Sequence, residues 1–128
     1  MSLRSPLGRV LGLGSAREGA DHWWLQRLTA VALVPLGLWL ACSMLRLPLH
    51  DHGAVVAWMA APLNTIALLL LVIAASWHAR LGVQVVIEDY VGTAWLKVTL
   101  LMLNTFAFFA AAVAGVVATL RVAFGVAP

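Results

Sequence analysis

Residues 76–91, SWHARLGVQVVIEDYV, gather several side chains capable of chemistry in an otherwise apolar sequence. His78 carries an imidazole, whose nitrogen can be an axial ligand of a haem iron. Asp89 carries a carboxylate that can accept a proton, and Tyr90 carries a phenol that can donate a hydrogen bond to a carbonyl oxygen. Arg27, in the segment HWWLQRLTA, offers a cation for an anionic partner. These types permit haem ligation, hydrogen bonding to a carbonyl group and proton transfer.

The spacing of His78 and Asp89 would place both on one face of a helix. Asp89 follows His78 by eleven positions, which is close to three turns and about 16 Å along a helix axis. Gly82 lies between them, but a glycine costs a helix only about 1 kcal/mol. Arg80 would lie about 200° around the helix from His78. We therefore expect a deep imidazole and a carboxylate near the surface to face the same neighbour, with Arg80 pointing elsewhere.

Each of these side chains also has an ordinary structural interpretation, which stays open for the single residue. His78 could hydrogen-bond a neighbouring helix, and Tyr90 could belong to the aromatic belt of a membrane protein. Asp89 and Glu88 could equally be solvated loop charges, and Arg27 could be an anchor whose long side chain reaches the membrane surface. The other histidines, at or beyond the ends of the apolar runs, are expected to be solvated: His22, His50 and His52.

The composition indicates a membrane protein. Apolar residues make up 63% and charged residues 10% of the 128 residues, against about 45–50% and about 25% in soluble chains. The net charge of +3 is spread over the ends of apolar runs, whereas a nucleic-acid-binding protein would gather it in a patch. A single cysteine, Cys42, predicts neither a disulfide framework nor a Cys-x-x-Cys metal site.

Three runs without Lys, Arg, Asp or Glu are long enough to cross a bilayer, which takes about 20 residues: Leu28–Leu45, His52–Ala79 and Val98–Leu120. Helices are expected, because backbone polar groups in hydrocarbon must be paired within the segment. We predict an all-α integral membrane protein that forms a single membrane-anchor domain over residues 1–128. Its expected parts are an N-terminal segment at 1–22 and transmembrane helices at 23–46, 56–82 and 93–121.

The basic residues predict the orientation of these helices. The segment VLGLG is too short for the apolar part of a signal peptide, so we expect the N-terminus to be retained, along the membrane surface. By the positive-inside rule the N-terminus and the loop after the second helix are cytoplasmic, or on the matrix side, and the C-terminus is on the outer side. The localisation that we expect is a bacterial inner membrane crossed three times, with the C-terminus periplasmic. The two sets of basic residues are Arg4, Arg9, Arg17, Arg27, Arg80 and Lys97 on one side and Arg46 and Arg121 on the other.

Two motifs carry a resemblance to a known family. His78 is followed after ten residues by Asp89-Tyr90, and Arg27 stands inside LQRLTA. Together they resemble the hydrophobic membrane-anchor subunit of succinate dehydrogenase, respiratory complex II, over nearly the whole chain. The segment HWWLQRLTAVALVPLGLW is especially similar to the alphaproteobacterial and mitochondrial branch.

The resemblance implies a role for each site residue. His78 would be one of two axial ligands of a haem b, with the second ligand from the cytochrome b subunit of the same complex. Tyr90 would line the ubiquinone site and hydrogen-bond a quinone carbonyl. Asp89 would sit beside that site on a proton route, and Arg27 would lie near the haem propionates.

The resemblance also implies partners and an overall function. The cytochrome b subunit would lie beside this chain in the bilayer, and the flavoprotein and iron–sulfur subunits would dock on the cytoplasmic face. The complex would pass electrons from succinate to quinone, in the tricarboxylic acid cycle and the respiratory chain, and this chain would have no activity alone. A purely structural anchor without haem and an anchor of fumarate reductase stay open as alternatives. A small transporter is disfavoured, because no Asp or Glu lies within the three apolar runs.

Overall fold

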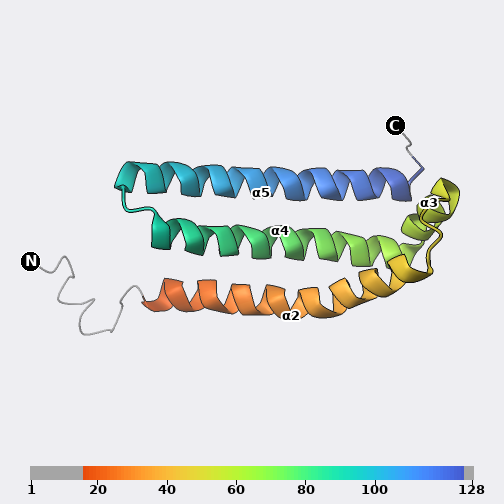
Figure 1. Ribbon diagram of the computed structural model, residues 1–128, viewed down its shortest axis with the longest axis horizontal. Coiled ribbons are helices and arrows are strands. Elements are labelled where there is room, and N and C mark those ends of the chain that lie inside the picture. Colours follow the sequence, from red (N-terminus) through yellow and green to blue (C-terminus); the bar gives the residue numbers. More distant parts are fainter. Residues whose placement is uncertain (1–15, 126–128) are drawn as a thin grey trace, which may run out of the picture.

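The computed structural model describes residues 16–125, which form four helices: α2 at Ala16–Arg46, α3 at His52–Ala60, α4 at Pro62–Tyr90 and α5 at Ala94–Ala123 (Figure 1). Three of them are long and apolar enough to cross a membrane, over Ala20–Arg46, Pro62–Tyr90 and Ala94–Ala123. The prediction of an all-helical chain with three spans is therefore confirmed. Arg4, Arg9 and most of the N-terminal segment expected at 1–22 lie outside the described residues, while its last part is the beginning of α2.

The second span differs from the expected 56–82, because two helices occupy this part of the chain. Ala61 separates α3 from α4 with an extended backbone, φ −63° and ψ 128°. A residue before a proline is pushed out of the helical region. Pro62 suits the first turn of α4, because an N–H group at that position would have no partner within the helix. The Thr65 hydroxyl then donates to the Met59 carbonyl at 2.7 Å, which ties the start of α4 back to α3. α3 is thus a short separate helix at one end of the molecule (Figure 1).

α4 is continuous to Tyr90, so His78 and Asp89 lie on one helix, as their spacing predicted. Its end is held by α5, because the Nζ of Lys97 donates to the carbonyl oxygen of Glu88 at 2.9 Å. The last carbonyls of a helix have no partner within the helix, and a lysine is a suitable donor for them. This contact fixes the short connection between the two helices.

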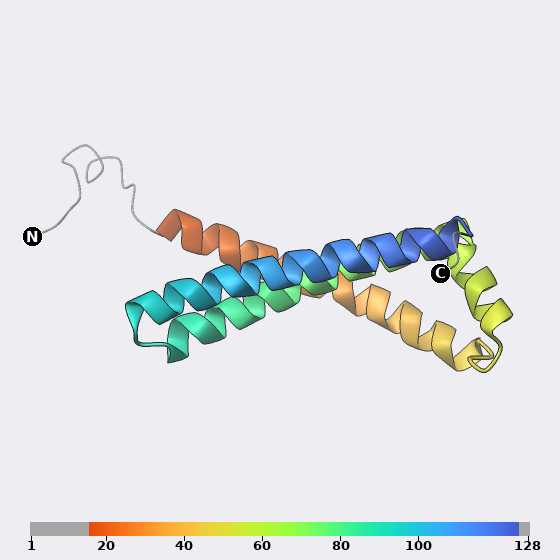
Figure 2. The same ribbon diagram turned by 90° about the horizontal axis from the view of Figure 1, so that it is seen from above.

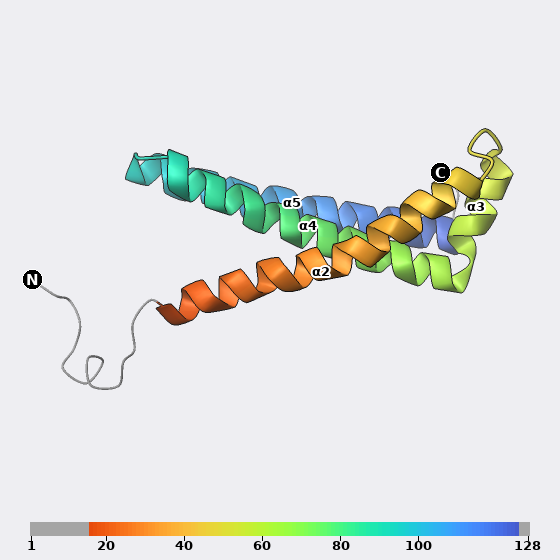
Figure 3. The same ribbon diagram turned by 60° about the horizontal axis from the view of Figure 1, so that its bottom comes forward.

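α4 is the central helix of the three spans. It contacts α5 more extensively than α2, and α2 and α5, within residues 16–125, do not contact each other. α4 and α5 lie side by side, while α2 crosses them obliquely (Figure 2 and Figure 3). The start of α2, the end of α4 and the start of α5 therefore share one end of the molecule (Figure 1). Which side of the membrane this end faces remains a prediction from the basic residues.

Few side chains are buried within the chain itself. Among the described residues only Leu81, Ile87, Asn104 and Thr119 are buried, whereas many large apolar side chains are exposed. Apolar contacts between helices gain little in lipid, because lipid tails solvate the same side chains, and small or polar residues decide how helices associate. The outer surface of the three spans is therefore suited to lipid and to other membrane-embedded chains.

Candidate functional site

His78 lies where α4 and α2 meet, and its ring contacts a hydroxyl group. The Nδ1 of His78 lies 3.1 Å from the Oγ1 of Thr29 on α2, and the imidazole is half-buried. The other ring nitrogen, Nε2, has no hydrogen-bond partner within the described part of the chain, and it is not a fully buried atom. The interhelical hydrogen bond foreseen for His78 thus uses one nitrogen only. The second nitrogen stays available to a ligand at the surface of the chain.

Two other polar side chains of α2 lie on the same helix face as Thr29. His22, Gln26 and Thr29 are spaced by four and three positions, the spacing of one helix face. The amide nitrogen of Gln26 lies so close to α4 that a Cβ added to Gly82 would be 3.9 Å from it. The Nε2 of His22 and the Oε1 of Gln26 are buried without a hydrogen-bond partner among the described residues.

The prediction that His22 is solvated is therefore wrong for this ring nitrogen. α2 begins at Ala16, so His22 lies within the helix rather than in a segment before it, and one of its ring nitrogens is buried. His50 and His52 are exposed, as predicted, because they lie at the connection between α2 and α3.

A groove of about 320 Å³ lies between α2 and α4 next to the His78–Thr29 pair. Apart from Thr29 and Trp77, its lining consists of aliphatic side chains from both helices. His78 is not among the lining residues, so the groove adjoins the pair through Thr29 alone.

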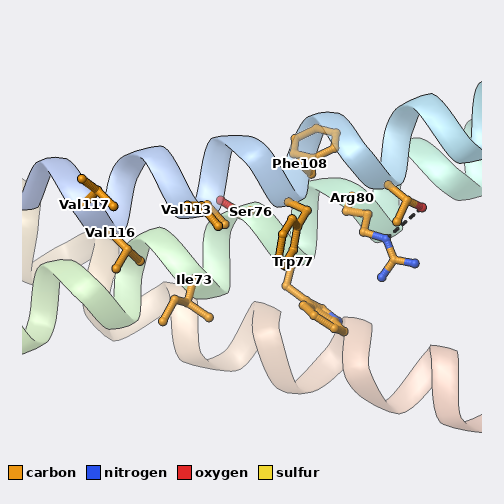
Figure 4. A pocket seen from close by; sticks show the side chains of 11 residues that line it. Ile73, Ser76, Trp77, Arg80, Phe108, Val113, Val116 and Val117 are labelled. Carbon is orange, nitrogen blue, oxygen red and sulfur yellow. Dashed lines mark hydrogen bonds between the residues drawn. The ribbon is translucent and has the colours of Figure 1, made fainter.

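Arg80 faces the other neighbour of α4, as its position around the helix predicted. Its Nε donates to the Oγ1 of Thr105 on α5 at 3.4 Å, and its guanidinium carbon lies 5.4 Å from the centroid of the Trp77 ring. Arg80 and Thr105 form the polar end of a second groove, of about 560 Å³, in which Ile73 and Val113 lie further along (Figure 4). The side chains of His78 and Arg80 thus contact different helices, α2 and α5.

Asp89 and Tyr90 occupy the last turn of α4 and are both exposed, Tyr90 to 85%. Neither side chain has a hydrogen-bond partner within residues 20–125. Glu88 differs, because its carboxylate accepts a hydrogen bond from the Nε2 of Gln84 at 2.8 Å. The two neighbouring carboxylates, both of which could have been solvated charges, are therefore distinct: Glu88 is engaged locally, and Asp89 has no side-chain partner within residues 20–125.

Arg27 lies on α2, apart from the other candidate residues. Its side chain is exposed, and its guanidinium carbon lies 5.4 Å from the centroid of the Trp23 ring. Among the described residues it forms no ion pair with Asp89. The chain by itself thus places its candidate residues on two helices, without direct contact between Arg27 and the end of α4.

Sequence reasoning missed Thr29, which stands in the segment that contains Arg27. The available signal was a hydroxyl residue within an apolar run, since such residues often bond across helices in membranes. The signal is weak, because a helical threonine commonly bonds the carbonyl of the preceding turn. Asn104, buried on α5 and donating to the Arg80 carbonyl at 3.0 Å, was missed for a similar reason.

Comparisons with known proteins indicate the family of the chain. Residues 1–119 match the family of the succinate dehydrogenase/fumarate reductase transmembrane subunit. A succinate dehydrogenase hydrophobic membrane anchor subunit of Rickettsia bellii is 40% identical over 99 residues, 77% of this chain and 79% of the relative. The succinate dehydrogenase membrane anchor subunit of Reclinomonas americana is 32% identical, over 65% of this chain and 72% of the relative. The corresponding protein of Paracoccus denitrificans is 30% identical, over 67% of each chain.

The family match covers nearly the whole chain, and the three relatives are all membrane-anchor subunits of succinate dehydrogenase. Three apolar helices with little internal core suit a subunit that is completed by lipid and by other chains. The chain therefore belongs to the family of succinate dehydrogenase/fumarate reductase transmembrane subunits, among the membrane-anchor subunits of succinate dehydrogenase.

Proposed function

We propose that this chain anchors the flavoprotein and iron–sulfur subunits of a succinate:quinone oxidoreductase and helps to bind a haem b and ubiquinone. The observation that carries the proposal is the arrangement along α4. An imidazole with one accessible nitrogen lies within the span, and an unengaged carboxylate and phenol lie at the end of the same helix. One helix then links a cofactor site inside the membrane to a quinone site at its surface.

His78 is the residue that would hold the haem. A protein needs to supply only axial ligands to haem iron, and a neutral imidazole nitrogen is a common one. The residues present fit this group, because Nε2 is accessible while Nδ1 is engaged by Thr29. Haem iron supplies a carrier for single electrons. A second axial histidine would come from the cytochrome b subunit, and the exposed Arg27 would pair with the propionates.

Tyr90 and Asp89 would serve the quinone. Conversion of ubiquinone to ubiquinol takes up two electrons and two protons. The phenol of Tyr90 donates a hydrogen bond to a quinone carbonyl and so stabilises the negative charge that develops on its oxygen. The carboxylate of Asp89, on the adjacent residue, relays one of the two protons from water to that oxygen, and the other proton is taken up at the second carbonyl oxygen. Both side chains are exposed in this chain, which leaves them free to meet a ligand bound between subunits.

The proposed orientation in the membrane concerns the end of the molecule at which Tyr90 and Asp89 lie. The beginning of α5, which contains Lys97, and the first half of α2, which contains Arg27, lie toward the α4–α5 connection (Figure 1). By the positive-inside rule this end faces the cytoplasm of a bacterium, where the catalytic subunits would dock. The quinone site would then lie beside the iron–sulfur protein that delivers the electrons.

The experiment that tests the haem assignment is the visible spectrum of the purified complex with His78→Ala. We expect haem to be lost or to become high-spin, because one axial bond is removed. His52→Ala is the matched control, since His52 is an exposed histidine at the opposite end of the molecule. A His78→Ala complex with wild-type band shape and haem content would show that His78 is only a hydrogen-bonded histidine. A wild-type complex without haem would favour the purely structural anchor.

A further inference from the structure

The hydroxyl group of Thr29 has three possible partners but only one proton. Its Oγ1 lies 2.8 Å from the Leu25 carbonyl and 3.1 Å from the Gln26 carbonyl, both in the preceding turn of α2. It lies 3.1 Å from the Nδ1 of His78. A helical threonine characteristically donates to the carbonyl four residues earlier, and the shortest of the three distances is to that carbonyl. The hydroxyl proton is therefore directed at the backbone.

A hydroxyl oxygen whose O–H group is hydrogen-bonded to the backbone can still accept hydrogen bonds through its lone pairs. The Thr29 oxygen can then only accept a hydrogen bond from the His78 ring, which requires the ring proton on Nδ1. In a neutral imidazole the other nitrogen then carries the lone pair. That nitrogen, Nε2, is the one that has no partner within residues 20–125 and is accessible.

We infer that Thr29 is a positioning residue for haem ligation: its hydroxyl holds His78 in the tautomer with the proton on Nδ1 and presents Nε2 as the axial ligand. This inference rests on the proposed haem site. Metal-ligating histidines generally donate their second N–H group to an oxygen, which fixes the ring orientation and makes the ligating nitrogen more basic. Here the oxygen belongs to Thr29 on α2, so the crossing of α2 and α4 sets the tautomer and the ring orientation of His78.

The hydrogen bond has an electronic consequence as well as an orienting one. A more basic ligand stabilises ferric iron over ferrous iron, so the bond from Nδ1 to Thr29 lowers the midpoint potential of the haem. Removal of the hydroxyl would weaken the ligand and leave the Nδ1 proton without its acceptor in a half-buried place. The potential should therefore rise, and the haem should be held less tightly.

The test compares Thr29→Val with Thr29→Ser in the purified complex. Valine keeps the shape and removes the hydroxyl, whereas serine keeps the hydroxyl. We measure the haem midpoint potential by spectrophotometric redox titration, the electron paramagnetic resonance of the ferric haem, and the rate of haem transfer to an acceptor protein. We expect a more positive potential, altered g values and a haem loss on the order of 10–100-fold faster for Thr29→Val, with near wild-type values for Thr29→Ser.

The matched control is Thr119→Val. Thr119 is a buried threonine whose hydroxyl, among the described residues, bonds only the Gly115 carbonyl in the preceding turn of α5, so its loss should leave all three haem measurements unchanged. If the valine variant at position 29 does not assemble, Thr29→Ala carries the same expectation. A wild-type potential and haem loss rate in the hydroxyl-free variant, together with haem loss in His78→Ala, would overturn the positioning role alone. Wild-type haem in His78→Ala would overturn the haem assignment itself.

Discussion

The two sides of α4 are built differently. On the side of α5, Gly115 brings the helices so close that an added Cβ would lie 2.7 Å from the Cγ1 of Val72. The buried Asn104 donates to a backbone carbonyl of α4 on this side. On the side of α2, the contact includes the His78–Thr29 pair, which uses only one nitrogen of the imidazole. Apolar grooves, and buried polar atoms without a partner among the described residues, occur on both sides.

This difference suggests that the contact with α5 mainly stabilises the chain, whereas the groups near α2 and at the end of α4 are available for chemistry. In lipid, close packing at small residues and hydrogen bonds hold helices together, and the contact with α5 has both. The contact with α2 leaves an imidazole nitrogen accessible, and the end of α4 leaves the side chains of Asp89 and Tyr90 free. Substitutions toward α5 should therefore affect assembly of the complex, and substitutions at the free polar groups should affect electron transfer.

The largest effect should come from Gly115→Val, which would break the contact with α5. The added methyl groups would collide with Val72, whose side chain is stiff in a helix because it is branched at Cβ. Overpacking of this kind costs about 1–3 kcal/mol, so the complex should dissociate at a lower temperature, as measured by thermal unfolding of the purified complex. Gly37→Val is the control, because a Cβ at Gly37 meets nothing within 4 Å. Equal stability of the two variants would contradict the distinction between the two sides.

Tyr90→Phe should have an intermediate effect, on turnover alone. The ring is kept and the hydroxyl is lost, and Tyr90 is 85% exposed in the chain, so the complex should assemble normally. Loss of a hydrogen bond to a neutral carbonyl typically costs about 0.5–1.5 kcal/mol, which is a few-fold to about tenfold in the step that it serves. We expect quinone reductase activity to fall by that factor while succinate oxidation with an artificial acceptor is retained. Unchanged quinone reduction would make Tyr90 an interfacial aromatic residue only.

Asp89→Asn should have the smallest effect, a few-fold decrease in quinone reduction with an altered pH dependence. The amide keeps the size of the side chain but cannot relay a proton. Glu88→Gln is the matched control, since Glu88 is the preceding carboxylate on the same helix and already bonds Gln84. The interpretation predicts a slower reaction for the first variant and an almost normal one for the second. Identical pH–rate profiles for Asp89→Asn and the wild type would remove the proton route through this residue.

The sequence by itself determined the three spans, the continuous helix that joins His78 to Asp89 and the different directions of His78 and Arg80. These features depend on the transfer of apolar runs to lipid and on the period of one helix, and both can be read from neighbouring residues. The break at Ala61 before Pro62 was equally local, although the expected span of 56–82 passed through it. Local signals therefore accounted for the helices and for the different faces of α4 on which His78 and Arg80 lie.

The tertiary structure decided which groups meet. Thr29 and His78 are 49 positions apart in the sequence, and only the oblique crossing of α2 over α4 brings them together. Both Glu88 and Asp89 could be solvated charges by sequence, but Glu88 is engaged by Gln84, and Asp89 has no side-chain partner among the described residues. The physical reason is that hydropathy indicates whether a helix is stable in lipid. An apolar helix is nearly equally apolar on every face, so hydropathy does not indicate which face meets another helix. The rotation and crossing of helices depend instead on a few small and polar side chains, whose partners lie far away in the chain.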